Sequence, residues 1–383
     1  MNAPRILFYV QHLLGIGHLA RASRISSALH RAGANLKLVT GGAPVDGFPP
    51  SEIAHVALPP VVASEGFSGL AHPDGSAVDE RFLNDRRDLL LSIYSEFQPD
   101  IVIVEAFPFG RRQMRFELVP LLEAISQGAP KPLLACSLRD IMQERTKPGR
   151  NEETVELVRR YFDLVLVHGD AAFARLEETF PLAGQIADRI AYTGMVAGPA
   201  PDAPQERFDI LISAGGGAAG RKLVAASVDA AAKMPRDRSI SLITGPNLPE
   251  ADYRHALAAA SPNLSVFRFR PDFPDLLSGA KLSVSQAGYN TVCDILRARC
   301  RSLLIPFAEG GETEQTSRAR RLEALGLASM LSEEKLDGDT LLIAIEGALE
   351  QNPPPASTLD LNGAQRTVQI LLEHWRVRQS QSA

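Results

Sequence analysis

Short apolar runs that alternate with longer amphipathic segments constrain the fold of this chain more than any other sequence feature. Runs rich in Val, Ile and Leu, with few polar residues, are typical of parallel β-strands buried on both faces. After the first run, apolar residues recur three or four positions apart from Leu19 to Ala32, with Gly33 just beyond, which predicts an amphipathic helix. The runs lie at 5–10, 34–40, 100–106, 131–137, 163–169 and 189–194, then at 207–213, 239–245, 264–269, 281–285 and 302–307.

A stretch with three prolines and no periodicity, "GPAPDAP", separates the two series of runs and has the composition of a linker. Two successive βαβ series on either side of a linker predict an α/β fold with two doubly wound, Rossmann-like domains. We expect an N-terminal domain at 1–197, a linker at 198–206 and a C-terminal domain at 207–356. A chain of 383 residues suits two domains of ordinary size.

A last helix is predicted after a second proline run at 352–357. Because this helix is separated from the second domain's core, we expect residues 357–383 to cross back to the first domain. Residues 45–80 lack periodicity and are predicted to form a long mobile loop. The apolar stripe of the last helix consists of Leu361, Ala364, Val368, Leu371, Leu372 and Trp375.

Composition excludes several classes of partner. The net charge is −5 and the Lys and Arg residues are scattered, which argues against a nucleic-acid partner. Cys136, Cys293 and Cys300 have no metal-ligand spacing, so we expect no metal site, no disulfide framework and a reducing cytoplasm. No run approaches the ~18 apolar residues of a membrane span. We therefore expect no transmembrane segment, and contact with the inner face of a membrane would be peripheral.

Each predicted domain has a glycine-containing turn after its first strand. Backbone N–H groups at a helix N-terminus suit a phosphate, and glycine lets the ligand approach closely because it has no Cβ. A tight strand-to-helix junction would explain the same glycines, so each turn alone leaves both interpretations open. The turns contain Gly15, Gly17 and His18 in the first domain and Gly215, Gly216 and Gly217 in the second.

The segment after the strand at 281–285 carries a more specific pattern. Gly288 ends a turn, Asn290 and Thr291 can cap the helix that follows, and Asp294 lies in its first turns. Gly288 and the helix N-terminus can hold a phosphate, and Asp294 can accept hydrogen bonds from two ribose hydroxyls. Open α/β sheets bind ligands at this carboxyl edge.

The next strand, at 302–307, leads into "AEGGETEQ" at the same edge of the predicted sheet. The acidic and amide side chains of Glu314 and Gln315 can hydrogen-bond to sugar hydroxyls. The segment from 281 to 328 is therefore predicted to bind a nucleotide sugar.

Taken together, these residues resemble the GT-B glycosyltransferases of family 28, the group that includes the peptidoglycan N-acetylglucosaminyltransferase acting on lipid-linked muropeptide. The family's Gly-x-x-Thr-x-x-acid helix start is matched by Gly288, Thr291 and Asp294, and its acid/amide-Gln pair by Glu314 and Gln315. Its N-terminal Gly-x-Gly-His is matched by Gly15, Gly17 and His18, and its second glycine turn by Gly215 to Gly217. This chain has Asp294 where the family usually has Glu, and its first glycine turn is leaner.

The resemblance implies two domains that face a cleft and a reaction that transfers a sugar from a nucleotide diphosphate, UDP in the family, to a hydroxyl acceptor with inversion. It implies no cofactor and no metal, because helix N-termini and backbone amides stabilise the leaving diphosphate. It also implies an acceptor that is a small molecule or is linked to a lipid.

His18 is the predicted base, since it lies at the carboxyl edge of the first strand and its ordinary pKa near 6.5 suits neutral pH. Phosphate binding or local capping by His18 is the competing interpretation. Glu105, at the end of the run 100–106, is predicted to orient His18 or to act as the base itself. Arg111 is predicted to meet an anionic acceptor or a phosphate, although an ordinary helix face would have the same sequence.

Other polar residues follow strands but rank lower, and His12 is expected to be a solvated loop residue. The lower-ranking residues are Arg139, Asp140 and His168.

Two other functions use the same residues. A nucleotide-sugar 2-epimerase would share the two-domain scaffold but needs further acids and histidines for proton removal. A non-catalytic protein that binds a nucleotide sugar or a polyprenyl group would keep the donor segment without the base.

Overall fold

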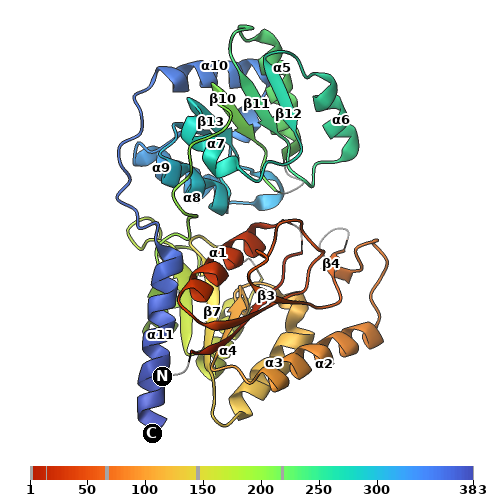
Figure 1. Ribbon diagram of the computed structural model, residues 1–383, viewed down its shortest axis with the longest axis vertical. Helices are drawn as coiled ribbons and strands as arrows, with labels where there is room; N and C mark the ends of the chain where they lie inside the picture. The colour runs from red at the N-terminus through yellow and green to blue at the C-terminus, as the bar shows by residue number, and fades with distance from the viewer. Residues whose placement is uncertain (1–2, 14, 65–68, 144–146, 217–219, 383) are drawn as a thin grey trace. The chain divides into compact units, whose positions relative to one another are not determined.

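The computed structural model describes residues 3–13, 15–64, 69–143, 147–216 and 220–382. The chain forms two compact units, shown in Figure 1. Unit 1 comprises Met1–Val196 and Asn362–Ala383, and unit 2 comprises Ala197–Leu361. Each unit is a parallel sheet covered by helices, which confirms the predicted α/β class.

The sheet of unit 1 has the strand order β3-β2-β1-β6-β7-β8-β9, and its neighbouring strands are parallel. The order runs outward in both directions from β1 and β6, so the topological switch point lies where these two strands end. Every predicted run of this unit forms a strand. The strands are β1 (Arg5–Val10), β2 (Asn35–Thr40), β3 (Ala54–Ala57), β6 (Ile101–Glu105), β7 (Leu133–Arg139), β8 (Leu164–His168) and β9 (Ile190–Tyr192).

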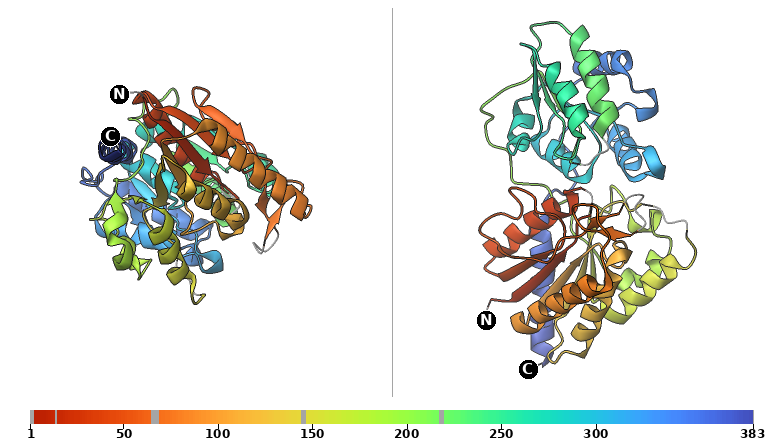
Figure 2. Two further views of the ribbon diagram at one scale, coloured as in Figure 1. Left: turned by 90° about the horizontal axis from the view of Figure 1, so that it is seen from below. Right: turned by 90° about the vertical axis from the view of Figure 1, so that its right-hand side faces the viewer.

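Helices cover both faces of this sheet, as Figure 2 shows. In α1, four residues of the predicted apolar stripe are buried, and the fifth, Ala32, is exposed just after the last helical residue: the buried ones are Leu19, Ala22, Ile25 and Leu29. The apolar faces of α2, α3 and α4 pack over β1, β6, β7 and β8 in one continuous core. The helices are α1 (Gly17–Arg31), α2 (Glu80–Phe97), α3 (Arg115–Gln127), α4 (Arg150–Tyr161) and α11 (Gly363–Ser382), with 3₁₀ turns at Arg112–Met114, Leu176–Glu178 and Ala183–Arg189.

The C-terminal helix α11 returns to unit 1 and packs along α1, as predicted (Figures 1 and 2). Leu371 and Trp375 of its apolar stripe are buried. Near the end of the helix, Arg378 Nη2 lies 2.8 Å from Asp163 Oδ1. The last turn of the chain is thereby tied to the loop before β8.

The expectation of one long mobile loop at 45–80 was wrong for the part of that segment that forms strands. Residues 54–57 form the edge strand β3, and the short strands β4 (Val62–Ala63) and β5 (Leu70–Ala71) pair in an antiparallel ladder. β3 gives little sequence signal because its side chains are exposed or half-buried. Backbone pairing with β2, rather than apolar burial, therefore fixes this strand.

Unit 2 has the strand order β12-β11-β10-β13-β14-β15, again with parallel neighbours, and its switch point lies between β10 and β13. Its strands are β10 (Ile210–Ser213), β11 (Ile240–Ile243), β12 (Leu264–Phe267), β13 (Leu282–Ser285), β14 (Ser302–Leu304) and β15 (Ser329–Met330). Its helices are α5 (Arg221–Lys233), α6 (Glu250–Ala258), α7 (Phe273–Gly279), α8 (Tyr289–Ala298), α9 (Glu314–Ala324) and α10 (Gly338–Glu350), with 3₁₀ turns at Glu309–Gly311 and Glu333–Lys335.

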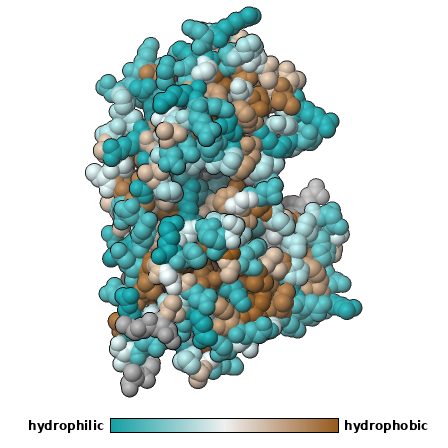
Figure 3. All heavy atoms as spheres, in the orientation of Figure 1, coloured by the Kyte–Doolittle hydropathy of each residue, from teal (hydrophilic) through white to brown (hydrophobic). Residues whose placement is uncertain are grey.

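Hydrophilic side chains cover most of the face shown in Figure 3, with smaller hydrophobic areas between them. Among the described residues, no helix is both long enough and apolar enough to cross a membrane.

Candidate functional site

The structure brings His18 and Glu105 together at the switch point of unit 1. Glu105 is the last residue of β6 and is fully buried, and His18 is the second residue of α1. The imidazole Nδ1 of His18 lies 3.0 Å from Oε1 of Glu105, and its side chain is 20% exposed. The carboxylate accepts the Nδ1 proton, so the imidazole keeps its lone pair on Nε2.

Glu105 belongs to a continuous buried row of polar side chains. Arg21, one turn after His18, donates to Oε1, and the Ser137 hydroxyl donates to Oε2. His168 Nε2 lies 2.9 Å from Ser137 Oγ, and its Nδ1 lies 2.9 Å from Thr193 Oγ1. Both carboxylate oxygens of Glu105 are thus held in place by named donors.

Burial sets the charge states in this row. Burial alone would raise the pKa of Glu105, but Arg21 and the hydrogen bonds from His18 and Ser137 hold that pKa well below its ordinary value. Burial, followed by the positive charge of Arg111, lowers the pKa of His18 to about 3. The expected pKa near 6.5 was therefore wrong for the folded chain, because that expectation assumed a solvated imidazole. His18 is neutral at pH 7, and Glu105 is ionised.

Two members of the row were missed from the sequence. Arg21 follows His18 by three positions, so the two share a helix face, but its partner Glu105 is 84 residues away. Ser137 was predicted only as the end of an apolar run. His168 was a lower-ranking residue, and its full burial between Ser137 and Thr193 ties it to the row.

Arg111 lies beside His18 in an unusual backbone conformation. Its φ is +58°, in the left-handed region that side chains rarely adopt, and its Nε donates to the carbonyl of Gln11 at 2.8 Å. Burial, followed by the nearby charge of Arg139, lowers the pKa of Arg111 to about 10, so the guanidinium stays charged at pH 7.

A cavity of about 300 Å³ opens beside His18 and Arg111. It is lined by His18, Arg21, Ala106, Phe109, Gly110, Arg111, Leu138, Arg139, Met142, Gln143, Lys147 and Arg150.

The first glycine turn is open rather than crowded. A Cβ added at Gly15 would meet no atom of the described structure within 4 Å, and Gly17 begins α1. Gly42, by contrast, is crowded, because a Cβ there would collide with His12. His12 was expected to be solvated but is 6% exposed, with Nε2 2.8 Å from the carbonyl of Ala43. Its burial depends on a loop 30 residues away, which the local sequence does not reveal.

In unit 2, three strand ends meet at the switch point. Gly215 follows β10 and has φ +79°. Gly245 follows β11, and a Cβ added there would collide with the carbonyl oxygen of Gly215. Asn247 Nδ2 donates to the carbonyl of Gly216 at 2.6 Å. Gly217, the third predicted residue of this turn, lies outside the described residues. The close backbone approach explains why glycine stands at 215 and 245.

The turn after β13 carries the predicted donor-binding residues. Gly288 is the N-cap of α8, and Asn290 and Thr291 lie in the first turn. Asp294 lies one turn further and is 8% exposed. The structure thus places Gly288 and α8 at the switch point beside the turn of Gly215, since Gln286 Oε1 would lie 3.0 Å from a Cβ at Gly215.

Glu314 and Gln315 begin α9, and their side chains have protein partners. Glu314 Oε1 accepts from Arg318 at 2.7 Å, and the same guanidinium donates to the carbonyl of Ala287 at 2.9 Å. Gln315 Oε1 accepts from the backbone N–H of Phe307 at 3.2 Å. Arg318, which was missed from the sequence, therefore ties α9 to the turn before α8.

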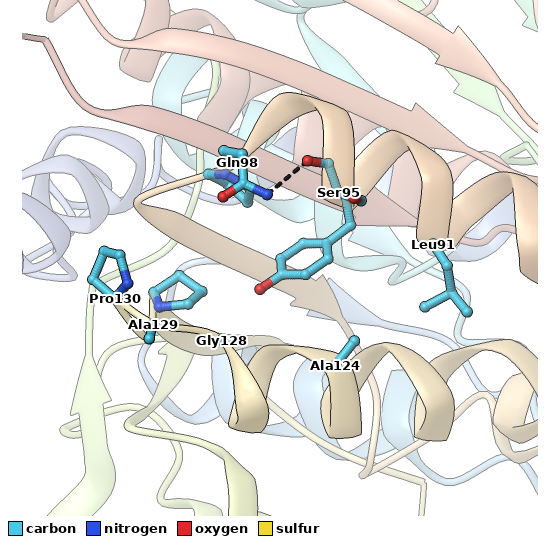
Figure 4. Close-up of a pocket in the computed structure, with 10 residues that line it drawn as sticks. Leu91, Ser95, Gln98, Ala124, Gly128, Ala129 and Pro130 are labelled. Atoms are coloured by element: carbon cyan, nitrogen blue, oxygen red, sulfur yellow. Dashed lines mark hydrogen bonds between the residues drawn. The ribbon is translucent and has the colours of Figure 1, made fainter.

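A second cavity of unit 1, of about 460 Å³, lies away from these residues. It sits before the amino ends of β6 and β7, and the close-up in Figure 4 shows Gln98 hydrogen-bonded to the Ser95 carbonyl on one side and Gly128 to Pro130 on the other. Its lining of Leu, Ala, Pro and Gly residues also includes the polar residues Tyr94, Ser95 and Gln98, but no acidic, basic or Cys side chain. In the described part of the chain, no group of three or more His, Cys, Asp or Glu side chains is arranged to hold a metal ion.

Comparisons with known proteins agree with this architecture. Residues 211–368 match the glycosyltransferase family 28 C-terminal domain. One curated relative is the UDP-N-acetylglucosamine--N-acetylmuramyl-(pentapeptide) pyrophosphoryl-undecaprenol N-acetylglucosamine transferase of Desulfitobacterium hafniense (strain Y51). It is 34% identical over 89 residues, which are 23% of this chain and 24% of the relative. The chain thus aligns with about a quarter of the length of this curated relative.

Two solved structures match nearly the whole chain. MurG of Acinetobacter baumannii has a TM-score of 0.57 at 14% identity, and the match covers 97% of this chain and 99% of that chain. UDP-GlcNAc 2-epimerase of Methanocaldococcus jannaschii, in complex with UDP-GlcNAc and UDP, has a TM-score of 0.60 at 11% identity, covering 96% of this chain and 99% of that chain. Identities this low establish the fold alone. The chain therefore has the GT-B fold, and its residues 211–368 are similar to the glycosyltransferase family 28 C-terminal domain.

Proposed function

We propose that this protein is a glycosyltransferase that moves a sugar from a nucleotide diphosphate sugar, UDP-linked, to a hydroxyl acceptor with inversion and without a metal ion. The family 28 match over residues 211–368 is the observation that carries the proposal. The Desulfitobacterium relative and the 2-epimerase complex are both named for a UDP sugar, which supports the choice of nucleotide.

Unit 2 would bind the donor. The N-terminus of α8 at Gly288 offers backbone N–H groups and the positive end of a helix dipole to the diphosphate. The turn of Gly215 and Gly216 lies beside it and adds close backbone approach. Asp294 would accept from the ribose hydroxyls, and Glu314 and Gln315 would contact the donor sugar. As the sugar leaves, negative charge develops on the diphosphate, and these dipoles stabilise it.

His18 of unit 1 would act as the base. Its Nε2 lone pair takes the proton of the acceptor hydroxyl while the oxygen attacks the anomeric carbon, and the bond to the diphosphate breaks. Glu105 holds the imidazole by Nδ1 and stabilises the positive charge that the imidazole gains, as the buried carboxylate does in a Ser-His-Asp triad.

Replacing His18 tests this assignment. We expect His18→Ala to lower kcat for sugar transfer by about 10²–10⁴-fold, the usual contribution of a general base, with the UDP dissociation constant unchanged. His30→Ala is the matched control, because His30 is exposed at the other end of the same helix. Transfer is measured as UDP released from the donor in the presence of an acceptor. Unchanged turnover in His18→Ala would remove this residue from the mechanism.

The similarity to a UDP-GlcNAc 2-epimerase favours a second candidate function on the same fold. An epimerase interconverts two donor sugars with no acceptor present, whereas a transferase releases UDP only when an acceptor is added. Incubating the protein with UDP-GlcNAc alone and analysing the sugar products therefore separates the two activities. A protein that binds UDP but does neither would be a binding protein.

A further inference from the structure

Arg318 of α9 is a fully buried arginine beside the proposed donor site. Its partner Glu314 lies one helical turn earlier and is also buried, with Oε1 2.7 Å from Nη2 of the guanidinium. Replacing a buried ion pair by apolar residues is often neutral or even stabilising, because both ions lose their water when they are buried. The stability of α9 alone therefore does not explain why this pair is present.

The guanidinium of Arg318 reaches from α9 to the start of α8. Its Nη1 donates to the carbonyl oxygen of Ala287 at 2.9 Å. Its central carbon lies 5.8 Å from the centroid of the Tyr289 ring, within the range of a cation–π contact. Ala287 and Tyr289 flank Gly288, the N-cap of α8. Arg318 thus contacts the residues on both sides of the N-cap.

The N-cap of α8 has room for a ligand. A Cβ added at Gly288 would meet no atom of the described structure within 4 Å. The first hydrogen bond within α8 runs from the N–H of Val292 to the carbonyl of Gly288, so helix geometry gives the N–H groups before Val292 no carbonyl to bind inside the helix. These N–H groups are the ones proposed above to bind the diphosphate.

The hydrogen bond from Arg318 acts on one of these groups through the peptide unit. The carbonyl of Ala287 and the N–H of Gly288 belong to the same planar peptide, in which oxygen and nitrogen share electron density. A cationic donor on the oxygen draws electron density from the nitrogen, and the N–H becomes a stronger hydrogen-bond donor. The same contact fixes the plane of the peptide and hence the direction of the N–H.

We propose that Arg318 is a positioning residue of the donor site, which orients and strengthens the Gly288 N–H for the diphosphate without touching the ligand. This role rests on the proposed function and adds a residue that lies outside the family's donor motif. Glu314 then has a second task besides the contact with the donor sugar, because it holds the Arg318 guanidinium in place.

Binding of diphosphates tests this role without a transfer reaction. Dissociation constants for UDP and for inorganic pyrophosphate are measured by calorimetry on the full chain at fixed ionic strength. In Arg318→Gln both affinities should fall about fivefold or more, because the site loses an oriented and polarised donor. Arg320→Gln is the matched control, since Arg320 is exposed on the same helix and its loss changes the net charge equally. Its affinities should stay within about twofold of the wild type. Wild-type affinities in Arg318→Gln would overturn the proposal.

A double variant separates this role from a simple charge effect. Arg318→Gln alone leaves Glu314 buried without its partner, and the uncompensated carboxylate would itself repel a diphosphate. Combining Glu314→Gln with Arg318→Gln removes both charges and therefore that repulsion. The loss of about fivefold in affinity for pyrophosphate should remain in the double variant. Recovery of the wild-type affinity there would overturn the proposal. If Arg318→Gln does not fold, as its circular dichroism spectrum shows, the neutral double variant carries the test.

Uridine distinguishes an effect on the diphosphate from a general disturbance of unit 2. Because uridine has no phosphate, its affinity, measured by NMR titration, should agree within about twofold in the wild type, Arg318→Gln and the double variant. A loss for uridine as large as the loss for UDP would give Arg318 a purely structural role and overturn the proposal.

The same titrations separate the role of Arg318 from the proposed function. If pyrophosphate binding depends on Arg318 but UDP binds no better than pyrophosphate, the role of Arg318 stands and the proposed UDP-linked donor fails. If sugar is transferred from a UDP sugar while Arg318→Gln binds diphosphates as the wild type does, the proposed function stands and the role of Arg318 fails. If the wild type binds neither UDP nor pyrophosphate, both fail.

Discussion

Glu105 keeps a negative charge where water does not reach, and the residues around it show how that charge is tolerated. An unpaired buried carboxylate would become protonated, but Arg21 supplies an opposite charge and Ser137 and His18 supply hydrogen bonds. Glu105 and Ser137 are register partners on β6 and β7, so the parallel sheet itself aligns them. The position of His18 is thereby fixed by the sheet rather than by its own loop.

Removing the charge of Glu105 should affect both catalysis and stability. We expect Glu105→Gln to lower kcat for transfer by about 10²-fold or more, because an imidazolium would no longer face a carboxylate. It should lower the free energy of unfolding by about 3–5 kcal/mol, because Arg21 stays buried without its counter-charge. Both are measured against Glu123→Gln, an exposed acid on α3. Wild-type turnover in Glu105→Gln would exclude a role for this carboxylate in the reaction.

His168 makes stability depend on pH. Burial lowers its pKa to about 3, so the folded chain keeps it neutral, whereas the unfolded chain takes up a proton below about pH 6.5. Protonation of the unfolded chain then favours unfolding. Between pH 7.5 and pH 5.5 this residue lowers the free energy of unfolding by about 1.4 kcal/mol. We expect His168→Gln to lack that loss. The pKa values of His12, His18 and His55 are also lowered. Because these residues are present in both the wild type and the variant, their effects cancel in the difference between the two proteins.

Urea unfolding followed by tryptophan fluorescence measures this difference. Trp375 is the single tryptophan and is buried in α11 of unit 1, the unit that contains His168. If the gap between wild type and variant is equal at pH 7.5 and 5.5, the neutral state of His168 is contradicted.

At the scale of elements, the glycine turns of unit 2 show which conformations the donor side requires. Gly245 has φ +88°, and its Cα lies against the backbone of Gly215. The two turns follow the neighbouring strands β10 and β11, so a change at 245 displaces the turn proposed to approach the diphosphate.

We therefore expect Gly245→Ala to destabilise unit 2 by more than 1 kcal/mol and to weaken UDP binding at least about tenfold. Gly347→Ala is the matched control, because Gly347 lies exposed in α10 with no atom within 4 Å of an added Cβ. That variant should gain about 0.5–1 kcal/mol of stability and bind UDP normally. Thermal denaturation with and without UDP measures both effects. Normal UDP affinity in Gly245→Ala would contradict the role given to this turn.

The elements that the sequence predicts well are those whose signal is local. All the apolar runs became strands, because buried parallel strands need nothing but apolar residues. β15 was missed since it has two residues, and β3 since its side chains are not buried. The Arg86 guanidinium shows the limit most clearly. It is fully buried between Glu117 and Gln11, and partners 31 and 75 residues away leave no periodic trace.

At the scale of the whole chain, the C-terminal helix α11 belongs to the same compact unit as the N-terminal strands. α11 packs on α1, and a bridge between Val196 and Asn362 joins the two segments of unit 1 at the point where the chain returns. A Cβ at Gly363 would collide with the backbone of Gly194 and Met195, so the return is tightly packed. Unit 1 is therefore incomplete until the last helix has been made.

Truncating a buried side chain of α11 should destabilise unit 1 and leave the stability of unit 2 unchanged. Leu371 is fully buried, and we expect Leu371→Ala to lower the stability of unit 1 by about 2–5 kcal/mol, the sum of lost burial and the cavity left behind. Val377→Ala on the same helix is the control, since Val377 is 53% exposed and its loss should cost less than about 0.5 kcal/mol. Urea unfolding followed by Trp375 emission reports on unit 1, and the UDP dissociation constant reports on unit 2. Equal urea midpoints for Leu371→Ala and Val377→Ala would mean that the packing of α11 does not stabilise unit 1. A loss of UDP affinity in Leu371→Ala would mean that unit 2 also depends on the packing of α11.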